Sequence, residues 1–364
     1  MTLTEREREV VALLRRDPLI GSAAIAEALG TTRAAVNVHL SNLGKKGVVL
    51  GRGYVLAEEP SVVVVGGANM DVKARSTRAA VPATSNPGAA TMAAGGVGRN
   101  IAENLARLGT RTHLVAAIGS DALGDQVLAA TSGAGVHVEH VRRSARATGT
   151  YTAVLDADGE LVVAVADMAA TDELAPEQVD AARDLLGAAE LVVLDGNLAT
   201  ATLGLALDLA TAAGTRVVLE PVSVPKAAAL APLVTAERPL FAITPNRDEL
   251  AALTDLPTRT ERQVRRAVAA LHDRGVALVW VRLGASGSLL STPHGTTDLA
   301  AVPAEVTDVT GAGDAMLAAF CHALLAGADP TDAAAYGHAA AALTVASPHT
   351  VRPDLTDRLV RSLL

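Results

Sequence analysis

The stretch that most constrains this chain lies near its C-terminus, where Thr307-Asp308-Val309-Thr310-Gly311-Ala312-Gly313-Asp314 opens directly into the apolar run Ala315–Phe320. The alanine-rich run favours a helix, so residues 311–314 should form its first turn, where backbone N–H groups have no partner within the helix and the dipole is positive. Two glycines let the backbone approach a ligand closely. The turn therefore predicts an anion hole suited to a phosphate. The local sequence leaves two roles open for Asp314, a helix cap or a general base beside a transferring phosphoryl group.

The composition indicates a two-domain protein with a large core of small side chains. The chain has 364 residues, of which 50% are hydrophobic but only 2% aromatic, a length that suffices for two domains. No apolar run approaches the ~20 residues of a membrane-spanning helix, and the N-terminus has no signal-peptide pattern. The single cysteine, Cys321, excludes an internal disulfide. These features predict a cytoplasmic protein with no membrane partner.

Residues 1–58 are expected to form a separate small domain. Apolar residues at helical spacing predict three helices, from Thr4 to Arg16, from Gly21 to Leu29 and from Thr31 to about Lys45, followed by a hairpin over residues 48–56. This order resembles the winged helix-turn-helix domain of bacterial regulators. The segment carries eight Lys and Arg against six Asp and Glu, although the whole chain has a net charge of −8.

The winged-helix resemblance implies that the third helix enters the major groove of DNA. The residues expected to face DNA are Arg33, Asn37, His39 and Ser41 on that helix, with Lys45, Lys46 and the wing residue Arg52 on phosphates. The mild positive charge means that binding needs a dimer and is sensitive to salt. The alternative is a small helical dimerisation domain with a solvated polar face. A charged linker ending at Pro60 separates this domain from the rest.

The second domain, residues 61–364, begins with a buried strand and two polar motifs. Ser61–Val65 is a continuous β-branched run, and Gly-Gly-Ala-Asn-Met-Asp follows it. This does not fit the dinucleotide-binding pattern G-x-G-x-x-G. Instead, Asn69 and Asp71 stand at the strand end, where open α/β sheets bind ligands. The glycines of Gly95-Gly96-Val97-Gly98-Arg99-Asn100 precede a predicted helix and let a substrate lie against bare backbone, within reach of the Asn100 amide.

These motifs resemble the two signatures of the ribokinase-like (PfkB) carbohydrate kinases, the C-terminal one at 308–314 and the N-terminal one at 95–100. The resemblance covers all of the chain beyond the first domain. It implies an α/β fold, a three-layer α/β/α domain with a mainly parallel sheet and a small β lid at roughly residues 72–92 and 148–166. It further implies that Asp314 takes the proton of the attacking hydroxyl and that the Gly311, Ala312 and Gly313 backbone stabilises the transferring phosphate. The acceptor-binding residues that it implies are Asn69, Asp71, Gly95, Gly96 and Asn100.

Within the family, the form of the motifs is most similar to that of pseudouridine kinases. The shared motifs are Asn86-Pro87-Gly88, the glycine-rich segment at 95–100, Val165–Met168, Asp195–Asn197, Pro245–Arg247 and Arg352–Leu355. This resemblance implies transfer of the γ-phosphoryl group of ATP to the 5′-hydroxyl of pseudouridine. The residues then expected near the nucleoside are Arg99, Thr148, Tyr151, Asp167 and Met168. It also implies a homodimer paired through the lid.

The nucleotide side is expected at two further strand ends. Asn246 and Glu249 place an amide and a carboxylate one helical turn apart. Hard oxygen ligands suit Mg²⁺, and the matching family motif organises the Mg²⁺–phosphate cluster, although a helix cap with an acidic first turn is the alternative. The resemblance also assigns Gly284, Gly287 and Thr310 to ATP and Asp308 to a monovalent-cation (K⁺) site. Arg282 stands where relatives usually carry Thr or Ser, so its role is open; it could pair with a phosphate.

Other functions remain to be weighed. One is a ribokinase or another nucleoside or sugar kinase, and another is a transcriptional regulator whose kinase-like domain only senses a nucleoside. The intact Asp314 argues against a purely sensory role. The segment His137-Val138-Glu139-His140 lacks a third ligand and is not expected to bind a metal. A P-loop kinase is excluded because the chain has no Walker A motif.

Overall fold

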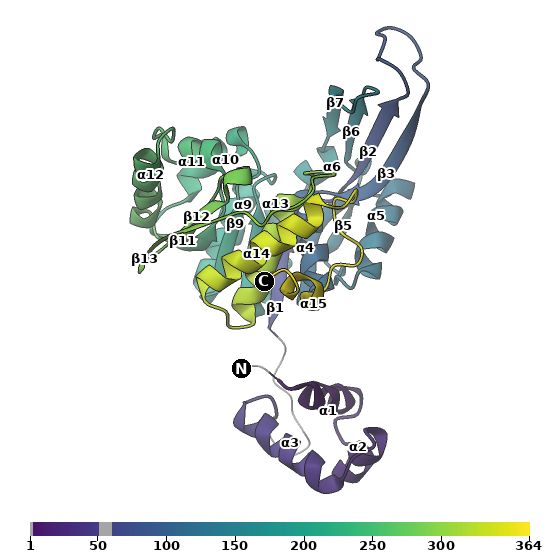
Figure 1. The fold of residues 1–364 in the computed structure, drawn as a ribbon, viewed down its shortest axis with the longest axis vertical. Helices are drawn as coiled ribbons and strands as arrows, with labels where there is room; N and C mark the ends of the chain where they lie inside the picture. Colours follow the sequence, from purple (N-terminus) through teal and green to yellow (C-terminus); the bar gives the residue numbers. More distant parts are fainter. Residues whose placement is uncertain (1–2, 51–59) are drawn as a thin grey trace. The chain divides into compact units, whose positions relative to one another are not determined.

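The computed structural model describes residues 3–50 and 60–364. They belong to two compact units, Met1–Glu59 and Pro60–Leu364, whose elements are labelled in Figure 1.

The N-terminal unit consists of three helices around a small apolar core. They are α1 (Glu5–Arg16), α2 (Ser22–Ala28) and α3 (Arg33–Lys45). Helix α1 begins with a capping box, in which Thr4 and Glu7 each accept a hydrogen bond from the other's backbone N–H. The fully buried side chains come from all three helices and include Val10, Leu14, Ile25, Val36 and Leu43. The three predicted helices are confirmed, whereas the wing strands predicted beyond residue 50 lie outside the described residues.

The large unit is organised around a mainly parallel sheet, as predicted. Its strand order is β13-β12-β11-β10-β9-β8-β1-β4-β5, and every neighbouring pair from β11 to β5 runs parallel. Only β12 and β13 continue the sheet antiparallel. The strands are β1 (Ser61–Val65), β4 (Arg111–Gly119), β5 (Val141–Ser144), β8 (Leu191–Asp195), β9 (Arg216–Glu220), β10 (Leu240–Ile243), β11 (Val276–Arg282), β12 (Ser288–Thr292) and β13 (Gly295–Leu299).

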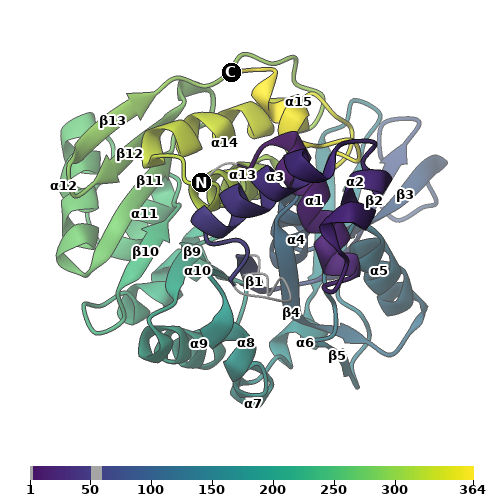
Figure 2. The same cartoon turned by 90° about the horizontal axis from the view of Figure 1, so that it is seen from below.

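Helices cover both faces of this sheet, which gives the three layers (Figure 2). Alternate residues of β1 point to opposite sides, with Val62 and Val64 in one core and Val63 and Val65 in the other. The first face carries α4 (Val97–Arg107), α5 (Ala122–Gly133), α13 (Ala312–Leu325), α14 (Pro330–Val345) and α15 (Asp357–Arg361). The second carries α7 (Pro176–Asp180), α8 (Arg183–Ala188), α9 (Thr200–Ala213), α10 (Val224–Leu230), α11 (Arg247–Thr254) and α12 (Glu261–Asp273).

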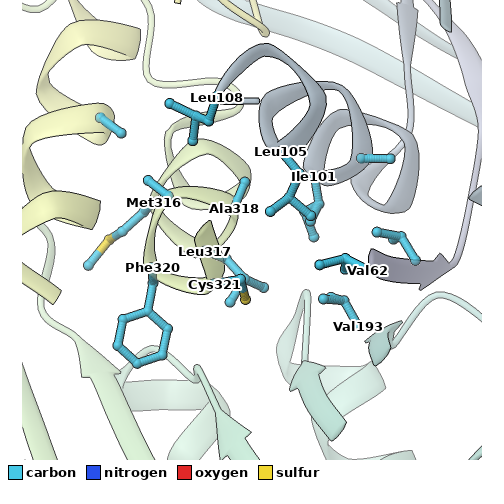
Figure 3. Close-up of a cluster of buried hydrophobic side chains, with 14 of the residues drawn as sticks. Val62, Ile101, Leu105, Leu108, Val193, Met316, Leu317, Ala318, Phe320 and Cys321 are labelled. Atoms are coloured by element: carbon cyan, nitrogen blue, oxygen red, sulfur yellow. The ribbon is translucent and has the colours of Figure 1, made fainter. Parts of the chain in front are cut away.

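Aliphatic and small side chains form the contact between α4 and α13, the two helices that lead into the site. Figure 3 shows Ile101 and Leu105 of α4 facing Leu317, Ala318 and Cys321 of α13. Larger groups are few, and the rings of Trp280 and Phe320 lie 4.6 Å apart beside them. The predicted core of small residues is what lets the two helix starts approach each other.

A second sheet of four strands, in the order β3-β2-β6-β7, forms the lid. Its strands are β2 (Asn69–Ser76), β3 (Gly88–Gly95), β6 (Thr150–Leu155) and β7 (Leu161–Asp167). Figure 1 shows these strands projecting past the end of the large sheet. The prediction of a lid in these two segments is correct, but β2 begins earlier than expected. Asn69 and Asp71 are already strand residues, not residues of the turn after β1.

Candidate active site

The start of α13 carries the carboxylate on which the site is centred. Gly311 precedes the helix with φ +80°, and a Cβ there would lie 2.0 Å from the carbonyl oxygen of Thr350. The side chain of Asp314 does not cap the helix. Its Oδ2 instead accepts a hydrogen bond of 2.9 Å from Asn100 Nδ2, at the start of α4. The structure thus removes the capping alternative and joins the two sequence signatures through one contact.

Burial makes this carboxyl group an unusually weak acid. Desolvation raises the pKa of Asp314 to about 8, and the negative charges of Glu220 and Asp195 act in the same direction. The Asn100 hydrogen bond and the Arg282 charge oppose the shift. A carboxyl group whose pKa lies near neutrality is suited to exchange a proton with a substrate.

The lid brings a second carboxylate to the same place. Asn69 Nδ2 donates a 2.7 Å hydrogen bond to Asp71 Oδ1, and desolvation raises the pKa of Asp71. A Cβ on Gly95 would lie 2.3 Å from Asp71 Oδ2, so the glycine leaves the space that this carboxylate occupies. The backbone of Gly96 follows directly and caps α4. This geometry agrees with a pocket for a hydroxylated acceptor.

Two of the residues predicted near the nucleoside lie close to these groups. Tyr151 is paired with Asp71 in the β2–β6 register, so both side chains are on the same face of the lid. Met168 lies near Asn69, because a Cβ on Gly149 would be 3.4 Å from the Met168 sulfur and 3.3 Å from Asn69 Cβ. Asp167, paired with Thr150, belongs to the other face of the lid, and its Oδ1 accepts from the Ala169 N–H.

The structure gives Thr148 and Arg99 supporting positions. Thr148 is buried and donates to Asp121 Oδ1 at 2.6 Å. Arg99 is only 4% exposed; it forms an ion pair with Glu103 and donates to Asn100 Oδ1 at 3.0 Å. Because that contact fixes which side of the Asn100 amide faces Asp314, Arg99 orients the amide. Both residues therefore support the site through contacts within the protein, and their direct binding to a substrate stays a prediction.

An apolar pocket of about 640 Å³ opens on the other side of the anion hole. Its walls include both predicted glycines, Gly284 and Gly287, and the N-terminal residues Ala312 and Gly313 of α13. The remaining wall is mostly aliphatic, with Val302, Val306, Val309, Ala341, Ala342 and Val345. Such a pocket has the volume and apolar lining typical of a small-molecule site, and its aliphatic walls suit the faces of a planar base.

Arg282 lies at the boundary between this pocket and the anion hole. Its Nη2 contacts Glu220 Oε1 at 2.6 Å and Glu249 Oε2 at 3.3 Å. Its Nη1 would be 2.8 Å from a Cβ placed on Gly313. The guanidinium is thus fixed by two carboxylates. It lies against the backbone of residues 311–313, the predicted anion hole, which is called the phosphate turn below. This placement favours the phosphate-pairing role that the sequence left open.

The motif at Asn246 acts first as a helix start. Asn246 Oδ1 accepts from the N–H groups of Asp248 and Glu249, and Glu249 Oε2 accepts from the Asn246 N–H, which forms a capping box. The cap engages the Asn246 oxygen, and the role of this residue at a Mg²⁺ site stays a prediction. Glu249 is 2% exposed, and within residues 3–50 and 60–364 its Oε1 accepts no hydrogen bond. One hard carboxylate oxygen therefore remains that fits Mg²⁺.

Asp308 is paired inside the protein. Its Oδ2 lies 2.6 Å from Lys73 Nζ of the lid, and its Oδ1 accepts from the Thr310 N–H at 2.9 Å. These bonds lower the pKa of Asp308 although partial burial opposes the shift. The residues present do not fit the K⁺ site expected there, because both carboxylate oxygens are engaged and an ammonium already supplies the positive charge.

The sequence analysis assigned no role to three residues of this region. Asp195 is fully buried, and its oxygens accept from the N–H groups of Gly67, Gly98 and Asn197, so it ties together the starts of the lid and of α4. Glu220 holds Arg282, and Lys73 holds Asp308. Asp195 and Glu220 are the last residues of β8 and β9. An acid at the carboxyl end of a parallel strand was the signal available for both.

The N-terminal unit exposes most of the side chains predicted to face DNA. Arg33, Asn37, Ser41 and Lys45 are exposed on α3 and His39 is half-buried. Lys46 is different, because its ammonium lies 2.6 Å from the buried Glu7 carboxylate and lowers the pKa of Glu7 to about 2. This contact secures α1, and the contact of Lys46 with a DNA phosphate stays a prediction. Arg52 lies outside the described residues.

The prediction that no third potential metal ligand lies beside His137 is wrong. His113, His137 and Glu139 have potential ligand atoms within 4.8 Å of one another. The two imidazoles are stacked, with centroids 4.5 Å apart and planes inclined by 19°. Stacked rings direct their in-plane lone pairs side by side instead of toward one point, so the arrangement does not form a coordination shell.

The comparisons with known proteins agree with this geometry. The family model described as pfkB family carbohydrate kinase matches residues 59–357. The chain belongs to the PfkB carbohydrate kinase family. As a PfkB kinase it is a phosphotransferase that uses an alcohol group of a sugar or nucleoside as the acceptor. A winged helix-turn-helix DNA-binding model matches residues 3–49.

Two curated relatives resemble this PfkB chain over most of its length. The uncharacterized sugar kinase YeiI of Escherichia coli is 35% identical over 356 residues, covering 97% of both chains. The pseudouridine kinase of Escherichia coli is 30% identical over 311 residues, which are 85% of this chain and 98% of that kinase.

Solved structures are similar to the kinase unit. Arabidopsis thaliana ribokinase, complexed with ribose and ATP, superposes with a TM-score of 0.74 at 29% identity and covers 84% of this chain and 99% of its own. A putative sugar kinase from Clostridium perfringens gives a TM-score of 0.75 at 28% identity, with 84% and 96% covered. Among the described residues, no helix has the length and apolar character needed to cross a bilayer.

The buried pair of Arg99 and Glu103 yields a stability prediction. Replacing Arg99 with Met should lower the free energy of unfolding by roughly 3–5 kcal/mol, because it leaves the Glu103 carboxylate buried with less compensation. Arg107→Met is the matched control, since Arg107 contacts the same carboxylate from a more exposed position. Urea unfolding followed by circular dichroism measures both. Equal losses for the two variants would contradict the special role of Arg99.

Proposed function

We propose that the chain is a pseudouridine kinase that transfers the γ-phosphoryl group of ATP to the 5′-hydroxyl of the nucleoside. The single observation that carries the proposal is the contact between Asn100 and Asp314, which joins a carboxyl group of raised pKa near the start of α13 to the start of α4. The 30% identity with a pseudouridine kinase supports the choice of acceptor. So do the motifs that the chain shares with such kinases.

In this reaction each residue has a defined task. Asp71, oriented by Asn69, accepts hydrogen bonds from ribose hydroxyls and aligns the acceptor. Asp314 removes the proton of the 5′-hydroxyl group. At the same time, the oxygen of this hydroxyl group forms a bond to the γ-phosphorus. The bond from that phosphorus to the β–γ bridging oxygen breaks, and ADP leaves with the electron pair. The N–H groups of the 311–313 turn and the Arg282 guanidinium stabilise the charge of the transferring group.

Mg²⁺ belongs to the proposal as well. When bound, it neutralises charge on the β- and γ-phosphates. Of the residues in this chain, Glu249 is our candidate to hold it, directly or through water. Thr310, Gly284 and Gly287 are proposed to contact the nucleotide.

The test of this function compares acceptors. Purified full-length protein, given Mg²⁺ and ATP, should consume ATP fastest with pseudouridine among pseudouridine, uridine, ribose and adenosine. Preference for another acceptor would retain the kinase and reject the substrate. Binding of an acceptor without any turnover would favour the second candidate function, a nucleoside-sensing regulator. The match of the N-terminal residues to a winged helix-turn-helix DNA-binding model is the observation that favours this candidate.

Asp314→Asn should reduce kcat by about 10²–10⁴-fold while leaving acceptor affinity largely intact, because the amide cannot take a proton. Asp332→Asn, on an exposed turn of α14, is the matched control. Product formed in reactions quenched at fixed times measures kcat, and equilibrium binding of the acceptor measures its affinity. Turnover that survives in Asp314→Asn would refute the assignment of the base.

The raised pKa of Asp314 predicts a pH profile. The base must be ionised, so kcat/KM for the acceptor should fall about tenfold per pH unit below a pKa of about 8 and level off above it. Arg282→Ser should move the inflection to higher pH, because it removes a nearby positive charge. Arg265→Ser, at an exposed ion pair, should leave the inflection unchanged. A flat profile between pH 6 and 9 would contradict the prediction.

The N-terminal unit is proposed to bind DNA through α3, so that one chain combines a kinase with a transcription factor. Removing Arg33 and Lys45 together should weaken binding and reduce the slope of log K against log salt by about one, since Lys45 is the predicted phosphate contact of the two. The charge-matched control removes Arg6 and Arg16 from α1. Fluorescence anisotropy with duplex DNA at several salt concentrations measures this. No binding by the intact protein would leave the unit as a dimerisation domain.

A homodimer paired through the lid is the last part of the proposal. The lid face that bears Met92, Val163 and Val165, opposite Asp71, is apolar, and these three side chains are 51–62% exposed. Val163→Glu with Val165→Glu should convert a dimer to a monomer in sedimentation experiments. Ala164→Glu, on the other face of β7, is the control. A wild-type protein that sediments as a monomer would exclude the dimer.

A further inference from the structure

A lysine of the lid reaches the phosphate turn of the kinase body. Lys73 follows Asp71 by two residues on β2, so both side chains are on the same face of the lid. Its Nζ lies 2.6 Å from Asp308 Oδ2 and 3.4 Å from Thr310 Oγ1, across 235 and 237 residues of sequence. The acceptor carboxylate and this ammonium are therefore carried by one short strand.

The contact completes the bonding of Asp308. The other oxygen, Oδ1, accepts from the Thr310 N–H at 2.9 Å and shapes the turn that leads to Gly311. Both side chains are partly shielded from solvent, with exposed fractions of 34% for Lys73 and 26% for Asp308. A monovalent cation at this carboxylate would have to approach an ammonium of the same charge or displace it.

We propose that the Lys73 ammonium takes the place of a monovalent cation at Asp308. The lid then orders the phosphate turn, and turnover does not require K⁺. The proposal rests on the kinase function proposed above. It links the two halves of the reaction: when the lid holds the acceptor through Asp71, the same strand secures the turn that receives the phosphoryl group. Lys73 is a positioning residue in this scheme, because it acts through Asp308.

The experiment measures turnover in KCl against choline chloride at equal ionic strength. Wild type should show the same rate in both salts. Lys73→Met should lose about tenfold or more in choline chloride, the size of a typical coupling between sites, and recover part of the loss in KCl. Lys73→Arg, which keeps the charge, should resemble wild type. Arg75→Met, on the same face of β2 but bonded to the Ala157 carbonyl oxygen, is the matched control and should also resemble wild type.

A second measurement does not depend on turnover. Isothermal titration of KCl into the full-length protein should give no K⁺-specific heat for wild type and a measurable one for Lys73→Met. This distinguishes the two proposals: absent turnover with every acceptor would sink the kinase function, whereas the titration would still decide the role of Lys73. K⁺ activation or K⁺ binding in wild type would overturn the inference, and so would a Lys73→Met protein that shows neither response to K⁺.

Discussion

The site depends on one guanidinium placed among carboxylates. Arg282 pairs with Glu220 and Glu249, which are 4% and 2% exposed, and its charge also reaches Asp314. Buried carboxylates that lie around the same group repel one another, and their ionisation costs free energy unless a cation compensates the charge. Because Arg282 ends β11 while its partners belong to β9 and α11, the same contacts that balance the charge also link the carboxyl ends of two strands that lie on either side of β10. The phosphate contact proposed for Arg282 would therefore use the same guanidinium that holds these elements together.

Packing of small residues makes the rest of the site possible. The start of α13 must come within hydrogen-bonding distance of α4, and Ala315, Ala318 and Ala319 are fully buried along it. On α14, a Cβ at Gly337 would lie 2.6 Å from the Trp280 ring and 2.8 Å from the Met316 carbonyl oxygen. Larger residues would push these helices apart and lengthen the Asn100–Asp314 contact. The low aromatic content of the chain is thus part of how the site is assembled.

The sequence predicted the layers of the fold and the two residues that meet at its centre, because motifs at strand ends and helix starts carry local signals. It did not predict the uses of Arg99 and Thr148, since a polar residue beside a motif can face the substrate or support its neighbour. Lys73 and Asp308 are 235 residues apart, and His113 is on a different strand from the segment at His137. Pairings of this kind depend on tertiary register, to which a single sequence gives no access. The Asn246 motif shows a further limit, because a helix cap and a metal ligand require the same residue types.

The strand that carries Asp71 and Lys73 restricts where this kinase can gain or lose residues during evolution. Side chains alternate between the two faces of the lid, so Val72 lies between them on the opposite face. Gaining or losing one residue between β1 and Asp71 would turn valine toward the acceptor and both charged groups away from it. The connection between β2 and β3, residues 77–87, is under no such restriction, because its length does not alter the pairing of the strands that it joins. The length of this loop can therefore change without reversing Asp71 and Lys73, whereas the short link after β1 must keep its length.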